Sequence, residues 1–117
     1  MNTELSRFAA HLRESIHSGF RNENFGVLAL NLFALQFKHN SAYRKICEAR
    51  RLTPENVEHW TQIPAAPTAA FKELELTSLA PHERTAVFHS SGTTAQIPSR
   101  HFQSAESLAV YEASLWK

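Results

Sequence analysis

Apolar side chains in the first half of the chain recur at steps of three and four residues, the spacing of one face of an α-helix. The first such segment carries its apolar residues at Leu5, Phe8, Ala9, Leu12 and Ile16. Thr3 precedes this pattern and is predicted to cap the helix, because a side-chain oxygen there accepts a hydrogen bond from a free backbone N–H. Gly19 is predicted to end the helix, because glycine readily takes the left-handed conformation found after helix ends.

A second segment, residues 25–37, is apolar on almost every face of the helix that it predicts. Asn24 is the expected cap. A helix without a polar face is expected to be covered by partners on all sides. The apolar run is about 13 residues long and is interrupted by Asn31 and Gln36, whereas a membrane span needs roughly 20 apolar residues. We therefore expect a buried helix and no membrane span.

Two more elements complete the helical first half. A third helix is expected after the break at Asn40 and Ser41. A short helix is then expected from Thr53, with Thr53 as its cap and Pro54 at its first position, where the missing N–H of proline is harmless.

The pattern changes from Ile63 onward. Pro64 and Pro67 favour an extended path, because the residue before a proline avoids the helical region. Thr68 is expected to cap a short turn over residues 71–74. Residues 81–84 are expected to form a polar connector, and residues 85–88 are predicted to form a strand. Ser104 is expected to cap a last helix.

These elements predict a mostly α-helical chain with one or two short strands. Residues 1–62 form its helical region, and residues 63–117 contain the proline segment, the strand, a Ser/Thr/Gly loop and a helix. The helical pattern continues to the last residue, Lys117, and a single strand does not make a sheet. We therefore expect residues 1–117 to be either a truncated piece of a larger protein or a domain that completes itself on a partner.

Composition excludes several classes of protein. The 117 residues are 43% hydrophobic and 20% charged, with a formal net charge of +1. These values fit a globular chain and give no basic stripe for nucleic acid. The seven histidines are scattered without metal-ligand spacing, so no metal site is expected. The one cysteine, Cys47, permits no internal disulfide and is expected to be a buried, inert thiol; with no signal peptide, this indicates a cytoplasmic protein.

The candidate chemistry lies in the loop after the strand. Its hydroxyl-bearing and glycine residues are Ser90, Ser91, Gly92, Thr93 and Thr94. Hydroxyl groups donate hydrogen bonds without carrying charge, and glycine lets backbone N–H groups approach an anion. The loop therefore suggests phosphate binding. An ordinary exposed turn is the alternative, because Ser, Thr and Gly are common turn residues.

The segment 87–94 resembles the phosphate loop of the adenylate-forming superfamily, which includes acyl-CoA synthetases and beetle luciferases. Together with residues 63–72 and with Ser99, Arg100 and His101, it is similar to the N-terminal part of acyl-protein synthetases, the LuxE-type long-chain-fatty-acid luciferin-component ligases. The resemblance implies an α/β fold in the complete enzyme, with residues 1–117 as a single N-terminal fragment of its adenylate-forming domain. It departs at Ala95, where the family usually has glycine, and at Pro98-Ser99-Arg100, which replaces the usual Pro-Lys.

The resemblance also implies a reaction. A long-chain fatty acid attacks the α-phosphate of ATP in the presence of Mg²⁺, which gives acyl-adenylate and releases pyrophosphate. The acyl group then passes to a protein thiol, with release of AMP, and from there to a reductase-like partner. Four residues are accessory candidates beside the loop: Lys72, His89, Arg100 and His101. Structural or surface roles are the alternative for each of them. No catalytic residue can be assigned, because the later motifs of the family have no counterpart here.

Three alternatives remain open at this point. The chain could belong to an enzyme similar to phenylacetate-CoA ligase, with coenzyme A as acceptor. It could be a non-catalytic helical interaction module, in which case it should be a monodisperse oligomer. If the chain belongs to a ligase, residues 25–37 could either line an acyl-chain tunnel or pack in a core.

Overall fold

The computed structural model describes residues 2–20, 24–90 and 98–115. The elements within these ranges, in chain order, are α1 (Thr3–Ser18), α2 (Phe25–His39), α3 (Ser41–Ala49), the 3₁₀ turn η1 (Trp60–Gln62), α4 (Ala70–Glu73), the 3₁₀ turn η2 (Pro81–Glu83), β1 (Ala86–His89), β2 (Arg100–Gln103) and α5 (Ala105–Leu115). The prediction of a mostly helical chain with short strands is confirmed.

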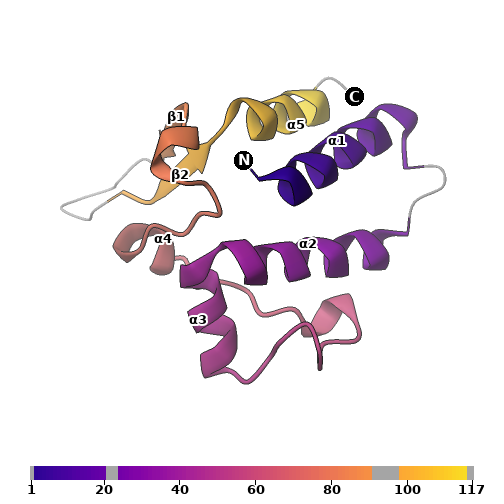
Figure 1. The fold of residues 1–117 in the computed structure, drawn as a ribbon. Helices are drawn as coiled ribbons and strands as arrows, with labels where there is room; N and C mark the ends of the chain where they lie inside the picture. Colours follow the sequence, from indigo (N-terminus) through magenta and orange to yellow (C-terminus); the bar gives the residue numbers. More distant parts are fainter. Residues whose placement is uncertain (1, 21–23, 91–97, 116–117) are drawn as a thin grey trace.

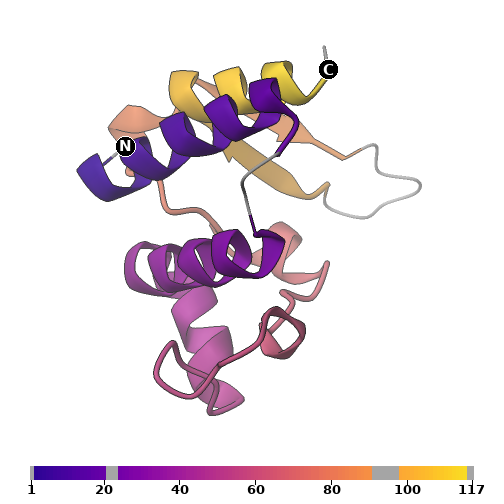
Figure 2. The ribbon, with the colours of Figure 1, turned by 90° about the vertical axis from the view of Figure 1, so that its right-hand side faces the viewer.

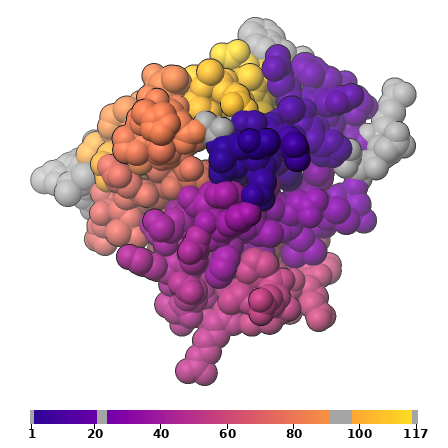
Figure 3. Space-filling model, in the orientation of Figure 1, coloured from indigo at the N-terminus to yellow at the C-terminus, as the bar shows by residue number. Residues whose placement is uncertain are grey.

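The helices form two layers. Helices α1 and α5 lie side by side in one layer, and α2 lies beneath them in the other, with α3 leading away from its end (Figures 1 and 2). The ion pair between Lys38 Nζ and Glu4 Oε1, at 2.6 Å, joins α2 to α1. The space-filling view shows α1, α2 and the strand region meeting on one face of the molecule (Figure 3).

Helix α1 begins one residue earlier than predicted. The side chain of Asn2, not Thr3, accepts the hydrogen bond from the Leu5 N–H at 3.0 Å, and Thr3 is the first helical residue. Asn and Thr are both common helix caps, so residue type alone does not distinguish Asn2 from Thr3 as the first cap. Gly19 ends the helix as predicted, with φ of 76° and its N–H bonded to the Ile16 carbonyl.

Asparagines start the next two helices. Asn24 caps α2 through the Val27 N–H at 3.3 Å, as predicted, and Asn40 caps α3 through the Tyr43 N–H at 3.0 Å. The prediction of a helix from Thr53 is wrong, because residues 54–56 form only a turn. Asn56 closes this turn: its side chain accepts from the Thr53 N–H at 2.8 Å and donates to the Arg51 carbonyl at 2.9 Å.

The compact part of the core lies between α2, α3 and residues 50–63. Phe33, Cys47 and Val57 are its buried members. The Phe33 ring meets the Tyr43 ring edge-on, with 6.2 Å between centroids. The partly buried side chains packed against this cluster are Leu30, Phe37, Tyr43, Leu52 and Ile63. This cluster fixes the angle between α2 and α3.

Complete cover for α2 was expected, and that prediction is wrong within this chain. Phe25 is 66% exposed and Val27 is 55% exposed. The accessible surface of the chain is 7905 Å², whereas a folded monomer of 13.2 kDa exposes about 6,400 Å². The chain therefore leaves apolar surface that its own residues do not bury.

A hairpin and short elements form the rest of the fold. Strands β1 and β2 are antiparallel, with Val87 opposite Phe102 and His89 opposite Arg100. Ser104 caps α5 as predicted, accepting from the Ser107 N–H at 3.1 Å. Capping by Thr68 is wrong: α4 starts after Ala69 without a side-chain cap.

No helix in the described part of the chain is both long enough and apolar enough to cross a membrane.

Candidate functional site

The predicted phosphate loop connects β1 to β2, and two serines pair across its base. The Ser90 N–H donates to the Ser99 carbonyl at 3.1 Å, and the Ser99 N–H donates to Ser90 Oγ at 2.9 Å. Pairing in the hairpin thus continues for one residue beyond each strand, through one backbone hydrogen bond and one to the Ser90 side chain. Ser91, Gly92, Thr93 and Thr94, which with Ser90 make up the predicted site, lie outside the described residues.

Ser90 keeps a donor despite this pairing. A serine hydroxyl has one O–H donor and two acceptor lone pairs, and the Ser99 N–H uses only an acceptor position. The side chain of Ser90 is also exposed. Ser90 is therefore placed at the start of the loop with a hydroxyl group that can still donate to an anion.

Two accessory candidates lie together at this end of the hairpin. His89 and Arg100 are direct partners across the strands, so their side chains project from the same face. The Arg100 guanidinium lies 5.6 Å from the Phe102 ring centre, and its Nη1 is 4.0 Å from Glu75 Oε1. That separation is long for an ion pair, and the Arg100 side chain remains 34% exposed. A guanidinium held this loosely can turn toward an anion at the loop.

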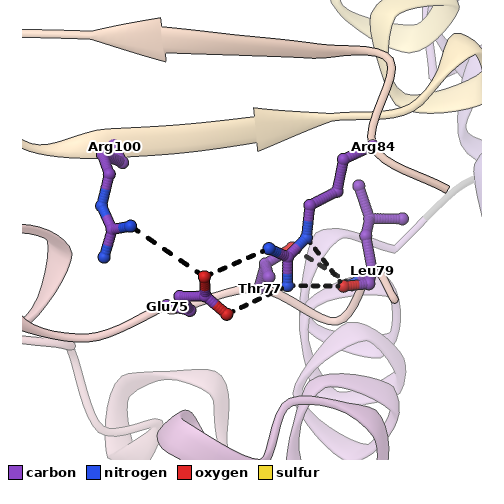
Figure 4. A network of polar contacts seen from close by, with 5 residues as sticks. All are labelled: Glu75, Thr77, Leu79, Arg84 and Arg100. Carbon is purple, nitrogen blue, oxygen red and sulfur yellow. Dashed lines mark hydrogen bonds and ion pairs between the residues drawn. The ribbon is translucent and has the colours of Figure 1, made fainter. Parts of the chain in front are cut away.

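A second arginine holds the acidic partner in place (Figure 4). Arg84 reaches the Glu75 carboxylate at 3.4 Å and donates to the Leu79 carbonyl from both Nε and Nη2, at 3.2 and 3.1 Å. Its guanidinium also stacks 4.4 Å from the centre of the Phe102 ring. Arg84 is thus held by three groups, whereas Arg100 meets the same carboxylate and the same ring at longer distances, 4.0 and 5.6 Å.

His101 lies apart from Arg100, because consecutive strand residues face opposite sides of a sheet. Its Nε2 is 3.0 Å from Ser99 Oγ, and its ring lies 4.9 Å from the ring of Phe71 on α4. Lys72 follows Phe71 on α4. The accessory candidates are therefore divided between the face with His89 and Arg100 and the side with His101 and α4.

Cys47 is fully buried and free, as predicted. Burial raises the pKa of the Cys47 thiol, which keeps it protonated at neutral pH. Burial likewise raises the pKa of the neighbouring Tyr43 phenol, whose hydroxyl donates to the Pro64 carbonyl at 2.6 Å. A protonated, inaccessible thiol is a poor nucleophile. Cys47 therefore serves packing.

Within residues 2–20, 24–90 and 98–115, no group of three His, Cys, Asp or Glu side chains is placed to hold a metal ion.

No sequence pattern singled out Glu75, Arg84 or Phe71 as neighbours of the hairpin. Glu75 and Arg84 are nine residues apart in irregular segments, where no helical or strand periodicity relates them. The one available signal was the Phe71-Lys72 pair in the segment used for the family resemblance, which drew attention to Lys72 and not to the aromatic ring beside it.

The family model for the acyl-protein synthetase LuxE matches residues 12–108. The match covers most of the chain, from the second half of α1 through α4 and the hairpin to the start of α5. This chain belongs to the LuxE acyl-protein synthetase family. Searches of curated proteins and of solved structures gave no significant match.

Proposed function

We propose that the chain is the N-terminal portion of an ATP-dependent long-chain fatty-acid ligase. In this proposal the complete enzyme forms an acyl-adenylate and transfers the acyl group to a protein thiol. The observation that carries the proposal is the paired base of the loop, Ser90 with Ser99, in a chain of the LuxE family. The pairing brings Ser90 and Arg100 to the two ends of one hydroxyl-rich loop.

In this proposal, residues 90–94 bind the β- and γ-phosphates through hydroxyl and backbone N–H donors. Arg100 supplies positive charge from the other end of the loop, with His89 beside it. Such positioned donors stabilise charge on transferring phosphoryl groups. Mg²⁺ would arrive with the phosphates, since it commonly binds through phosphate oxygens and few protein ligands. Lys72 and His101 are proposed on the α4 side, toward the fatty acid.

The acceptor thiol in this proposal is not Cys47, because that side chain has no exposed surface. The thiol belongs to a part of the complete enzyme beyond residues 1–117, and a reductase-like protein then receives the acyl group. We further propose that the enzyme works in the cytoplasm, where single cysteines stay reduced.

The nucleotide part of the proposal can be tested by titrating the 117-residue chain with a fluorescent ATP analogue in the presence of Mg²⁺. The double variant T93A/T94A should weaken binding by roughly tenfold or more, because each lost charge-assisted hydrogen bond is worth about 1.5–3 kcal/mol. Thr68→Ala is the matched control, since Thr68 is an exposed threonine outside the predicted site, residues 90–94. Equal binding by the two variants would contradict the proposed role of the loop.

The chemical part can be tested by fatty-acid-dependent exchange of labelled pyrophosphate into ATP. We expect no exchange by the 117-residue chain alone, because it lacks the later motifs of the family. Clear turnover by this chain would show that residues 1–117 contain a complete adenylation site.

One observation favours a second candidate, a helical interaction module. The chain exposes more surface than expected for its mass, including Phe25 and Val27 at the start of α2. Light scattering at modest concentration separates the two candidates. A monodisperse oligomer favours the module, whereas aggregation favours a fragment of the ligase.

A further inference from the structure

A cavity of about 400 Å³ lies beside α2, on the side that faces the proline segment and α4. Its apolar walls come from three parts of the chain. They are Ala29, Leu32 and Phe33 of α2, Ile63 and Ala66 of the proline segment, and Phe71 of α4. This volume falls within the usual range of small-molecule sites, about 300–1,000 Å³.

The residues that line this cavity include no charged side chain, and two of its polar groups already have partners. The Tyr43 hydroxyl donates to the Pro64 carbonyl at 2.6 Å, and the Asn40 side chain accepts the Tyr43 N–H at 3.0 Å. A water molecule needs two to four polar partners to be held in a cavity. The cavity is therefore suited to an apolar ligand.

The cavity is connected to the base of the loop through a short series of contacts. Phe71 forms part of its wall and lies 4.9 Å from the His101 ring. His101 Nε2 is 3.0 Å from Ser99 Oγ, and Ser99 pairs with Ser90 where the loop begins. A molecule with an apolar tail in the cavity and a polar head beyond Phe71 would thus reach the proposed phosphate site.

A neighbouring cavity of about 320 Å³ lies on the other side of α2, toward α1 and α5. Leu32 and Gln36 line both cavities. The second cavity also has several hydroxyl and amide side chains in its walls, among them Thr77, Ser78 and Ser107. Asn40 and Leu76 are shared by the two cavities as well, and the cavity beside Phe71 has the more apolar lining.

We propose that the cavity between α2, the proline segment and α4 binds the hydrocarbon chain of the fatty acid, with the carboxylate directed past Phe71 toward His101. This inference rests on the proposed ligase function and adds the location of its acyl chain. Of the two roles considered for residues 25–37, it favours lining an acyl-chain site over packing in a core. The residues proposed to contact the hydrocarbon chain are Leu32, Phe33, Ala66 and Phe71.

The test uses the 117-residue chain and cis-parinaric acid, a fluorescent long-chain fatty acid, below its micelle concentration. Ala66→Phe fills the cavity and should weaken binding by roughly tenfold or more, because the ring occupies the volume of the ligand. Ala65→Phe is the matched control: Ala65 is the exposed neighbour and does not line the cavity. Binding by Ala65→Phe should stay within about twofold of the unmodified chain.

Ala29→Phe, from the opposite wall, should reproduce the loss, so that the result does not depend on one variant's folding. Each variant's melting curve is recorded to confirm that it folds. Equal binding by Ala65→Phe and Ala66→Phe, in folded proteins, overturns the inference. A dimer in the unmodified chain that is lost only in Ala66→Phe also overturns it, because a second copy then covers the cavity.

Titration of the same variants with the fluorescent ATP analogue separates this inference from the proposed function. We expect Ala66→Phe to bind the nucleotide like the unmodified chain. If the chain binds the fatty acid through the cavity but does not bind ATP, the nucleotide proposal fails while the acyl-chain site stands. If it binds ATP but Ala66→Phe leaves fatty-acid binding unchanged, the acyl-chain site fails alone.

Discussion

The region around α2 and α3 and the region around the hairpin are held together by different interactions. The first is centred on Phe33, Cys47 and Val57, whose contacts are apolar and non-directional. The second is held by directed polar contacts, chiefly Arg84 with Glu75 and the Leu79 carbonyl, and Ser90 with Ser99. Apolar burial supplies most folding free energy, whereas hydrogen bonds fix positions at a small net gain.

This difference separates stability from candidate chemistry. The α2–α3 region can hold its shape whatever occupies the loop. Around the hairpin, the exposed Ser90 can donate to an anion while it keeps its bond from the Ser99 N–H. The loosely paired Arg100 can exchange Glu75 for an anion at low cost, because the new hydrogen bond replaces one of similar strength. The comparison predicts that substitutions in the first region reduce stability more than those in the second.

The largest effect is expected from Phe33→Ala. Phe33 is 3% exposed, so its loss leaves a cavity and should lower the free energy of unfolding by about 3–5 kcal/mol. Phe25→Ala on the same helix is the control, with an expected loss of about 1 kcal/mol or less, because Phe25 is mostly exposed. Urea denaturation followed by circular dichroism measures both. Similar losses would mean that α2 is covered differently from the arrangement described here.

Arg84→Ala should have the next largest effect. It removes two donors from the carbonyl of the buried residue Leu79 and the cation from the Phe102 ring, and should cost about 1–3 kcal/mol. Arg13→Ala, at an exposed position of α1, should stay within about 0.5 kcal/mol. The same denaturation experiment applies. A loss for Arg84→Ala that exceeds the loss for Phe33→Ala would reverse the comparison between the two regions.

Two buried helix caps allow a direct comparison at matched burial, since Asn40 and Ser104 are each 5% exposed. Asn40→Ala and Ser104→Ala should each cost about 0.5–2 kcal/mol through loss of the cap. We expect Asn40→Ala to cost more, because the second contact of the Asn40 side chain, with Gln36, joins α3 to the end of α2, whereas the second contact of Ser104, with Ser107, stays at the start of α5. Thermal unfolding measures the order, and a larger loss for Ser104→Ala would contradict it.

The smallest effect concerns the Cys47 thiol. Its pKa is raised in the folded chain, so the unfolded chain releases this proton first as pH rises. Its contribution to stability is therefore complete below the unfolded thiol's pKa of about 8.5 and declines above it. A thiol reagent at pH 8 should label Cys47 only in urea. Rapid labelling of the native chain would show that the α2–α3 region opens readily.

Local sequence signals correctly predicted the ends of several helices. Gly19, Asn24 and Ser104 act through hydrogen bonds or dihedral angles within a few residues, so the chain alone specifies them. Where two local choices competed, the prediction failed: Asn2 displaced Thr3 as a cap, and Asn56 closed a turn where a helix was expected.

The sequence by itself determined that this chain is mostly helical, that α2 is apolar on every side, and that a hydroxyl-rich loop follows a strand. These properties depend on periodicity and on residue chemistry, which are local. Only the tertiary structure decided that Arg100 pairs with His89, that Glu75 and Arg84 lie beside them, and that cavities flank α2 where a covered helix was expected. Contacts of that kind join residues far apart in the chain, and they follow from how the layers pack and not from any pattern within one segment.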